Sequence, residues 1–150
     1  MIVKTAAQAV SAIASDGAFP SQTWESRTAR LVARCRWGRA GAVITTHGEV
    51  DAANARQLVD FIDHCLNYCE WLVVDLSGLD FIGTVGLSAL HQVQDRCAAV
   101  GVNWALVPSP AVSKVLQFGE PDRALPISES LAEALVTVQN QSRRLQLVAQ

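Results

Sequence analysis

The sequence predicts an α/β domain with a mixed sheet of four to five strands and about four helices. Three patterns predict it: apolar residues alternate over 31–37, recur with helical spacing over 58–69, and form continuous runs at 71–74 and 102–107. Alternation is typical of a half-buried strand, a stripe at i, i+3 and i+4 of an amphipathic helix, and a continuous run of a strand covered on both faces. The 150 residues, 50% of them hydrophobic, suffice for one domain with its own core.

The N-terminal third is predicted to hold an arm, a hairpin and a helix. Residues 1–27 are small and polar without strong periodicity, so we expect an arm that is disordered or partly helical. The domain proper is assigned to residues 28–140. It begins with strands at 31–37 and 42–47, joined by a four-residue turn from Gly38 to Gly41. Asn54 then serves as the N-cap of the helix whose apolar stripe ends at Cys69.

The middle of the chain is predicted to alternate between buried strands and helices. The strand at 71–74 leads into a predicted loop from Asp75 to Asp80. Thr84 opens a helix that buries Leu87, Leu90, Val93 and Cys97. The strand at 102–107 should run parallel to the strand at 71–74, because a helix joins the two.

The C-terminal part is predicted to be mostly helical. A short helix follows Pro108, and residues 125–127 form at most a brief edge strand, since proline cannot donate to a ladder. Ser130 and Glu133 form a capping box for the last helix. Residues 141–150 are either a helical extension or a loose tail. The predicted order is β-β-α-β-α-β-α-(β)-α.

Composition excludes several classes of function. A net charge of −2 with 17% charged residues argues against nucleic-acid binding. No apolar run approaches the roughly 18 residues of a membrane helix, and the N-terminus is a poor signal peptide, so we expect a cytoplasmic protein without a membrane partner. The three histidines are spread over different elements and the four cysteines lack CxxC spacing, so no metal site is expected.

Two segments carry a resemblance to a known family. Gly48-Glu49-Val50-Asp51 with Asn54-Ala55 resembles the G-E-L-D-x-x-T-A turn of STAS domains. Residues 73–87, V-V-D-L-S-G-L-D-F-I-G-T-V-G-L, resemble the family signature V-L-D-L-S-G-V-x-F-I-D-S-S-G-L. Residues 108–112 and 125–127 look like the family's later elements. The resemblance spans about residues 28–138 and implies a STAS-like single domain of the anti-sigma-factor antagonist branch.

The resemblance implies a regulatory protein-binding module that is not an enzyme and needs no cofactor. Its partner would be an anti-sigma factor that is also a serine/threonine kinase. The unphosphorylated domain would bind this partner, and phosphorylation at Thr84 would break the complex. The implied partner-binding residues are Glu49, Asp51, Gly83, Thr84, Val85, Gly86 and Ser88. A homodimer formed through residues 1–27 is a further alternative, separate from the resemblance.

The chemistry at Thr84 agrees with a switch. A hydroxyl at a helix N-terminus lies beside unpaired N–H groups, and a phosphate there adds a charge of about −1.5 to −2 that the helix dipole tolerates. The sequence departs from the signature at Gly83, where the family has Asp, and at Val85, where a second Ser is common. Two alternatives therefore stay open. Thr84 is only a helix cap, or the chain is a constitutive scaffold or adaptor, as in stressosome-like or lipid-transport assemblies.

Other polar residues have a structural interpretation beside a functional one. Asp75 is expected to hold backbone N–H groups rather than to form an acid/base pair with Asp80. Arg30, Arg34 and Arg36 are expected on a solvated strand face, or on a surface for an acidic partner. The cysteines are expected in the core, with redox sensing by Cys65 and Cys69 as the alternative. Trp24 could dock the arm on the domain.

Overall fold

A computed structural model describes residues 22–25, 31–118 and 124–149, with side chains up to residue 142. Five strands form one sheet in the order β1-β2-β3-β4-β5. They are β1 (Gln22–Glu25), β2 (Leu31–Gly38), β3 (Gly41–Val50), β4 (Trp71–Ile82) and β5 (Asn103–Val107). The pairs β1–β2 and β2–β3 are antiparallel, whereas β3–β4 and β4–β5 are parallel. The predicted mixed sheet and the predicted parallel pair are confirmed.

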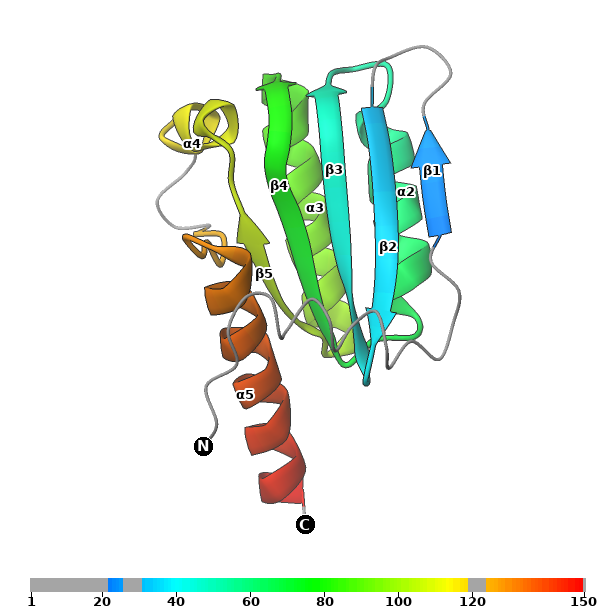
Figure 1. Ribbon diagram of the computed structural model, residues 1–150, viewed down its shortest axis with the longest axis vertical. Helices are drawn as coiled ribbons and strands as arrows, with labels where there is room; N and C mark the ends of the chain where they lie inside the picture. The colour runs from blue at the N-terminus through cyan, green and yellow to red at the C-terminus, as the bar shows by residue number, and fades with distance from the viewer. Residues whose placement is uncertain (1–21, 26–30, 119–123, 150) are drawn as a thin grey trace.

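Helices cover the sheet on both faces (Figure 1). Helices α2 (Ala55–Leu66) and α3 (Thr84–Val100) lie behind it, and α5 (Leu131–Ala149) packs on the opposite face over β4 and β5. Helix α4 (Pro110–Leu116) contacts β4 near the end where β5 leads out of the sheet. The apolar run in β4 follows from this arrangement: Leu72 and Val74 join the larger core under α2 and α3, while Trp71 and Val73 join the smaller core under α5.

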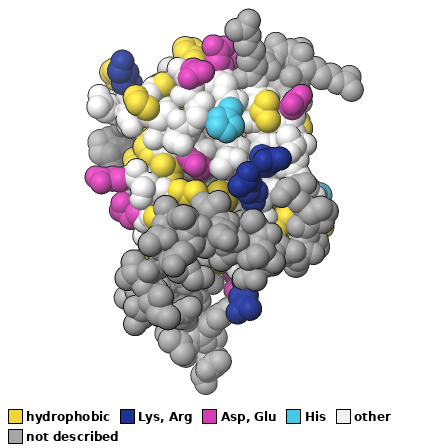
Figure 2. Space-filling model, viewed as in Figure 1, with side chains coloured by type: hydrophobic (Ala, Val, Ile, Leu, Met, Phe, Trp, Pro, Cys, Tyr) yellow, Lys and Arg dark blue, Asp and Glu magenta, His cyan; other side chains and the backbone are white. Residues whose placement is uncertain are grey.

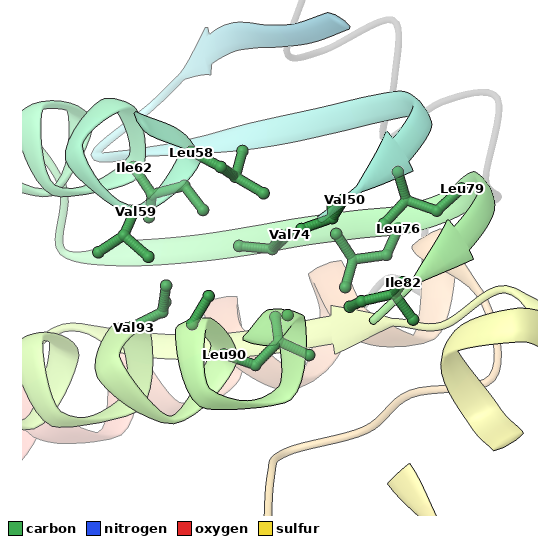
Figure 3. Close-up of a pocket in the computed structure, with 12 residues that line it drawn as sticks. Val50, Leu58, Val59, Ile62, Val74, Leu76, Leu79, Ile82, Leu90 and Val93 are labelled. Atoms are coloured by element: carbon green, nitrogen blue, oxygen red, sulfur yellow. The ribbon is translucent and has the colours of Figure 1, made fainter. Parts of the chain in front are cut away.

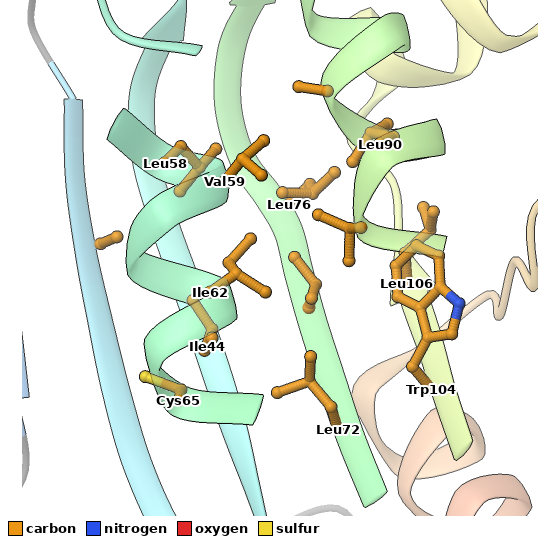
Figure 4. Packing of buried hydrophobic residues seen from close by; sticks show 14 of the residues in the cluster. Ile44, Leu58, Val59, Ile62, Cys65, Leu72, Leu76, Leu90, Trp104 and Leu106 are labelled. Carbon is orange, nitrogen blue, oxygen red and sulfur yellow. The ribbon is translucent and has the colours of Figure 1, made fainter. Parts of the chain in front are cut away.

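The larger core is densely packed. Figure 4 shows Ile44, Ile62, Leu72, Leu76 and Leu106 converging from three strands and α2. The void that remains between α2, α3 and the sheet has a volume of about 10 Å³ and only apolar walls (Figure 3). That is the size of about one water molecule. This core void is therefore too small to serve as an enclosed ligand site.

The β2–β3 hairpin is tighter than the sequence suggested. Gly38 and Gly41 pair with each other, so the turn is the two residues Arg39 and Ala40 rather than four. Ala40 has φ 62°, as a tight hairpin turn requires. A Cβ atom on Gly41 would lie 2.1 Å from the Trp71 ring, whose Nε1–H donates to the Arg39 carbonyl oxygen at 2.9 Å. Close contact with this indole explains the glycine at position 41.

The prediction of a loop from Asp75 to Asp80 is wrong, because β4 continues to Ile82. The prediction rested on the polar residues Asp75, Ser77 and Asp80, which are typical of loops. Leu76, Leu79 and Ile82 are buried, while Ser77 and Asp80 point to solvent. The strand β3 likewise runs past Gly48 to Val50, with register shifts against β4 between Thr45 and His47 and between Gly48 and Glu49. Such bulges let a strand continue through residues that break simple alternation.

Part of the predicted arm is a strand, which corrects the expectation of a disordered or partly helical segment there. Residues 22–25 form β1, which pairs with β2, so tertiary pairing outweighs the weak local pattern. Trp24 packs against Phe61 of α2 with ring centroids 6.3 Å apart, so it docks this segment as expected. The predictions for residues 1–21 and 26–30 lie outside the described residues.

The other predicted helices are present, with adjustments. Helix α2 ends at Leu66, so Cys69 lies beyond the helix rather than on its apolar stripe. Leu87 is only half-buried, and Gly86 and Ala89 pack inward on α3 instead. Ser130 Oγ accepts from the Glu133 backbone N–H at 3.1 Å, as an N-cap does, and α5 extends through residues 141–149. The segment 125–127 forms a single parallel bridge, Leu106 with Ile127, in agreement with a brief edge strand.

Candidate functional site

Two loops that are distant in sequence meet at one edge of the sheet. Val50 at the end of β3 pairs with Ile82 at the end of β4, and the Gly83 N–H donates to the Val50 carbonyl oxygen at 3.0 Å. The strands are parallel, so both carboxyl ends lie at the same edge. The turn that contains Glu49 and Asp51 and the start of α3 therefore form one surface, which brings the two resemblance-bearing segments together.

Asn54 holds the first of these loops from inside. It is fully buried, its Oδ1 accepts from the Asp51 N–H at 3.0 Å, and its Nδ2 donates to the Glu49 carbonyl oxygen at 2.9 Å. It stands at the predicted N-cap position of α2, but its side chain makes no cap hydrogen bond. Its amide instead satisfies the backbone of the turn between β3 and α2. The predicted position is therefore correct, but the predicted cap contact is not made.

Asp51 completes the same turn. Its Oδ1 accepts from the Ala53 N–H at 2.8 Å, which is the local backbone contact expected of a turn aspartate. The side chain is half-buried, whereas Glu49 is exposed. The turn is thus internally bonded, and Glu49 presents its carboxylate to solvent.

Gly83 is the N-cap of α3, with φ −81° and ψ 175°. Any residue can adopt this extended conformation, which is typical of N-caps. A Cβ atom at this position would meet only the Phe81 ring, at 3.8 Å. The backbone geometry does not require glycine here, so an Asp in this place would fit the same fold.

Gly86, in contrast, is required by packing. A Cβ atom there would lie 2.1 Å from Ile82 Cγ1 and 3.5 Å from Val50 Cγ1. The residue is buried against the ends of both strands. Gly86 therefore sets how closely α3 approaches the site, and it was predicted as a partner-contact residue but is not available to one.

The exposed residues around the start of α3 define a candidate contact surface, here called the Thr84 surface: Phe81, Thr84, Val85 and Ser88. Thr84 and Ser88 are exposed, and Phe81 and Val85 are 50% and 45% exposed. Phe81 was not singled out from the sequence. The course of β4 turns its side chain outward.

A polar groove continues the Thr84 surface between α2 and α3. It has a volume of about 340 Å³ and is lined on the α3 side by Val85, Ser88 and Gln92 and on the α2 side by Arg56 and Asp60. Farther along, Arg96 Nη1 and Asp63 Oδ2 form an ion pair at 2.9 Å that joins the two helices. The groove offers donors and acceptors to a partner that contacts the start of α3.

The described residues contain no group of three or more histidine, cysteine or acidic side chains that could hold a metal ion. Asp75 is structural, as expected: its Oδ1 accepts from the Ser77 N–H at 3.0 Å. Within the same described part of the chain, no helix has the length and apolar character needed to cross a membrane.

The basic stripe lies on the sheet face opposite α2 and α3. Arg34 is exposed and Arg36 is half-buried, and Arg30 falls outside the described residues. Figure 2 views this face and shows charged, polar and hydrophobic side chains intermingled. The mixed character agrees with a solvated strand face.

The fold and the surface define a class of protein: a small α/β domain with an exposed hydroxyl at the N-terminus of a helix, beside apolar side chains. The STAS domain profile matches residues 37–134. The chain belongs to the STAS domain family.

Named relatives refine this assignment. The chain is 37% identical over 111 residues to osmosensory protein A of Mycobacterium tuberculosis, which covers 71% of this chain and 70% of the relative. It is 31% identical over 100 residues to the anti-sigma-F factor antagonist RsfA of the same species, covering 64% of this chain and 78% of RsfA. Such antagonists are non-enzymatic regulators.

A solved structure shares the fold. The anti-sigma factor antagonist SpoIIAA in its unphosphorylated form superimposes with a TM-score of 0.57 and 22% identity, covering 81% of this chain and 97% of SpoIIAA. The sequence-based assignment to a STAS-like fold and to the antagonist-like branch is confirmed.

Proposed function

We propose that this protein is a regulatory binding module whose contact with an anti-sigma factor kinase is broken by phosphorylation at Thr84. The observation that carries the proposal is the exposed Thr84 hydroxyl on the first residue of α3, between the half-exposed side chains of Phe81 and Val85. Half-exposed apolar side chains around a polar centre are typical of a protein contact surface.

The position of the hydroxyl suits a switch that leaves the fold intact. The first N–H groups of α3 have no intrahelical partners, and the helix dipole is positive at this end. A phosphate on Thr84 would add a charge of about −1.5 to −2 where the helix accommodates it. A partner packed on Phe81 and Val85 would have to bury that charge, which costs several kcal/mol when no cation compensates it.

The neighbouring turn supplies the second half of the proposed contact. Glu49 is exposed beside the Thr84 surface, and the bonded turn around Asn54 holds it in place. A basic side chain on the partner would complement this carboxylate. Gly83 contributes through its N–H bond to Val50 rather than through a side chain.

The proposal is tested by phosphorylation and binding with purified anti-sigma factor kinases from the source organism. We expect one of them to add a single phosphate in the presence of ATP, mapped by mass spectrometry to Thr84 and absent in Thr84→Ala. The same kinase should bind the unmodified protein and Thr84→Ala, and bind Thr84→Glu at least ten-fold more weakly.

Thr137→Glu is the matched control, because Thr137 is an exposed threonine on α5, across the sheet from α3. It should bind like the unmodified protein. Equal binding of all four proteins, with no phosphate on Thr84, would leave Thr84 as a helix cap and the protein as a constitutive adaptor, which the Gly83 and Val85 departures favour.

A further inference from the structure

The polar groove between α2 and α3 runs along both helices, which lie side by side behind the sheet (Figure 1). On the α3 side, its lining residues recur at intervals of three or four: Val85, Ser88, Ala89, Gln92 and Arg96. This spacing places them on one face of the helix over about 16 Å, because each helical residue adds about 1.5 Å. An extended chain spans that length with about five residues.

The groove is open and its walls are polar. The buried side chains of Ala55, Val59 and Ala89 form its floor, and they are small enough to leave a depression between the helices. On the α3 wall, the side chains of Ser88 and Gln92 are exposed. An open groove of about 340 Å³ with this lining suits a segment of another protein, whereas small-molecule sites enclose most of their ligand.

The charged side chains of the lining are Arg56, Asp60 and Arg96. Arg96 is matched by its ion pair with Asp63. Arg56 and Asp60 are one helical turn apart on α2, but the described part of the chain shows no ion pair between them. Arg56 lies in the first turn of α2, at the sheet edge where α3 also begins, so it is the cation that the groove offers next to the Thr84 surface.

The position of Arg56 does not serve the stability of α2. It is the second residue of the helix, beside the unpaired N–H groups and the positive end of the helix dipole. An acidic residue is favoured there and a cation is disfavoured, yet the first turn of α2 contains no acidic residue. Departures from local preference without a stabilising contact are expected at functional sites.

We propose that the groove receives a short acidic segment of the anti-sigma factor kinase, with Arg56 as the residue that pairs with it. The inference rests on the proposed function, because the groove shares Val85 and Ser88 with the Thr84 surface. A partner seated on the Thr84 surface would extend directly into the groove. Opposite charges attract, so the unmatched guanidinium selects an acidic segment.

The same pairing would fix the orientation of the partner. Glu49 and Arg56 are both exposed and stand on either side of the turn that Asn54 holds. The partner would therefore present a basic side chain to Glu49 and an acidic one to Arg56. Such a pattern of complementary charge sets the register of a complex and speeds its association.

The test measures the association of Arg56→Glu with the kinase that binds the unmodified protein, by surface plasmon resonance at low and at high salt. At low salt, we expect the association rate constant to fall on the order of ten-fold for Arg56→Glu and about three-fold for Arg56→Gln. The differences should shrink at high salt, because ions screen exposed charges. The melting temperature of Arg56→Glu should equal or exceed that of the parent, since an acidic residue suits the first turn of a helix.

Arg34→Glu is the matched control, because it makes the same charge change at an exposed arginine on the opposite face of the sheet. It should associate like the unmodified protein. Equal rates for the unmodified protein and Arg56→Glu, or an equal loss in Arg34→Glu, would overturn this inference and leave the proposed function standing. A lowered melting temperature of Arg56→Glu would also overturn it, since Arg56 would then stabilise α2. Failure of every kinase to bind the unmodified protein would overturn the proposed function and this inference together.

Discussion

The helix cap at position 83 offers a direct test of how the Thr84 site is built. Gly83 has an extended conformation and open space at its Cβ, so aspartate should fit without strain. An N-cap carboxylate can accept hydrogen bonds from the backbone N–H groups of the first turn of α3. Gly83 has no side chain to accept them. Replacing glycine by a good cap contributes a few tenths of a kcal/mol, and the negative charge at the dipole about 0.3–1 more.

We therefore expect Gly83→Asp to stabilise the protein by about 0.5–1.5 kcal/mol. For a chain of this size, each kcal/mol raises the melting temperature by roughly 2–4 °C. Gly83→Asn, which caps without charge, should gain a few tenths, and Gly83→Ala, which fits but cannot cap, should lose about 0.5–1 kcal/mol. Thermal and urea unfolding of the four proteins would measure this order.

The acidic variant carries its own internal check. The advantage of Asp over Asn depends on the ionised carboxylate, so it should be present at neutral pH and disappear as the pH falls below about 4. A uniform loss of stability in Asp, Asn and Ala variants would refute the reasoning. It would mean that position 83 needs glycine for its backbone, contrary to the φ and the open space described above.

Three further predictions concern the scaffold around the site. Gly41→Ala drives a methyl group into the Trp71 indole and should cost about 1–3 kcal/mol in urea unfolding, whereas unchanged stability would show that the ring shifts freely. Asn54→Ala leaves two backbone groups of the turn at 49–51 without their buried partner and should cost about 1–3 kcal/mol and weaken partner binding; stability equal to the parent would contradict the bonding described. Burial raises the pKa of the Cys97 thiol from 9.0 to about 12, so the fold favours the neutral thiol over the thiolate. The free energy of unfolding should therefore be unaffected by this group below pH 9 and should fall as the pH rises from 9.0 toward about 12. Cys97→Ala should flatten that alkaline decline in urea titrations.

The sequence predicted most of the layers because their signals are local. The stripe of α2 and the apolar run at 71–74 each determine an element with little help from the rest of the chain. The extension of β4 through Asp75 and Ser77 could not be found in this way. The strand continues past them because β3 pairs alongside with a register shift, which is tertiary information.

The candidate site was predicted in outline and not in detail. The resemblance located Thr84, Gly83 and Glu49, but it could not tell that Gly86 is buried or that Phe81 is exposed. Both outcomes depend on how α3 leaves the end of β4. Asn54 shows the same limit, because its buried amide bonds to a turn whose shape no local pattern encodes.

The ends of the sheet have a consequence for the protein at high concentration. On one side the sheet ends in β1, four residues of which three are polar. On the other side, within the described part of the chain, β5 is extended by a single bridge to Ile127. Short, polar edges are poor templates for the strands of another molecule. Behind β1 lies β2, eight residues long with alternating buried side chains. The short strand β1, anchored by Trp24, thus covers the longer edge of β2. A chain shortened before residue 31 would expose the edge of β2 to strand pairing with other protein molecules.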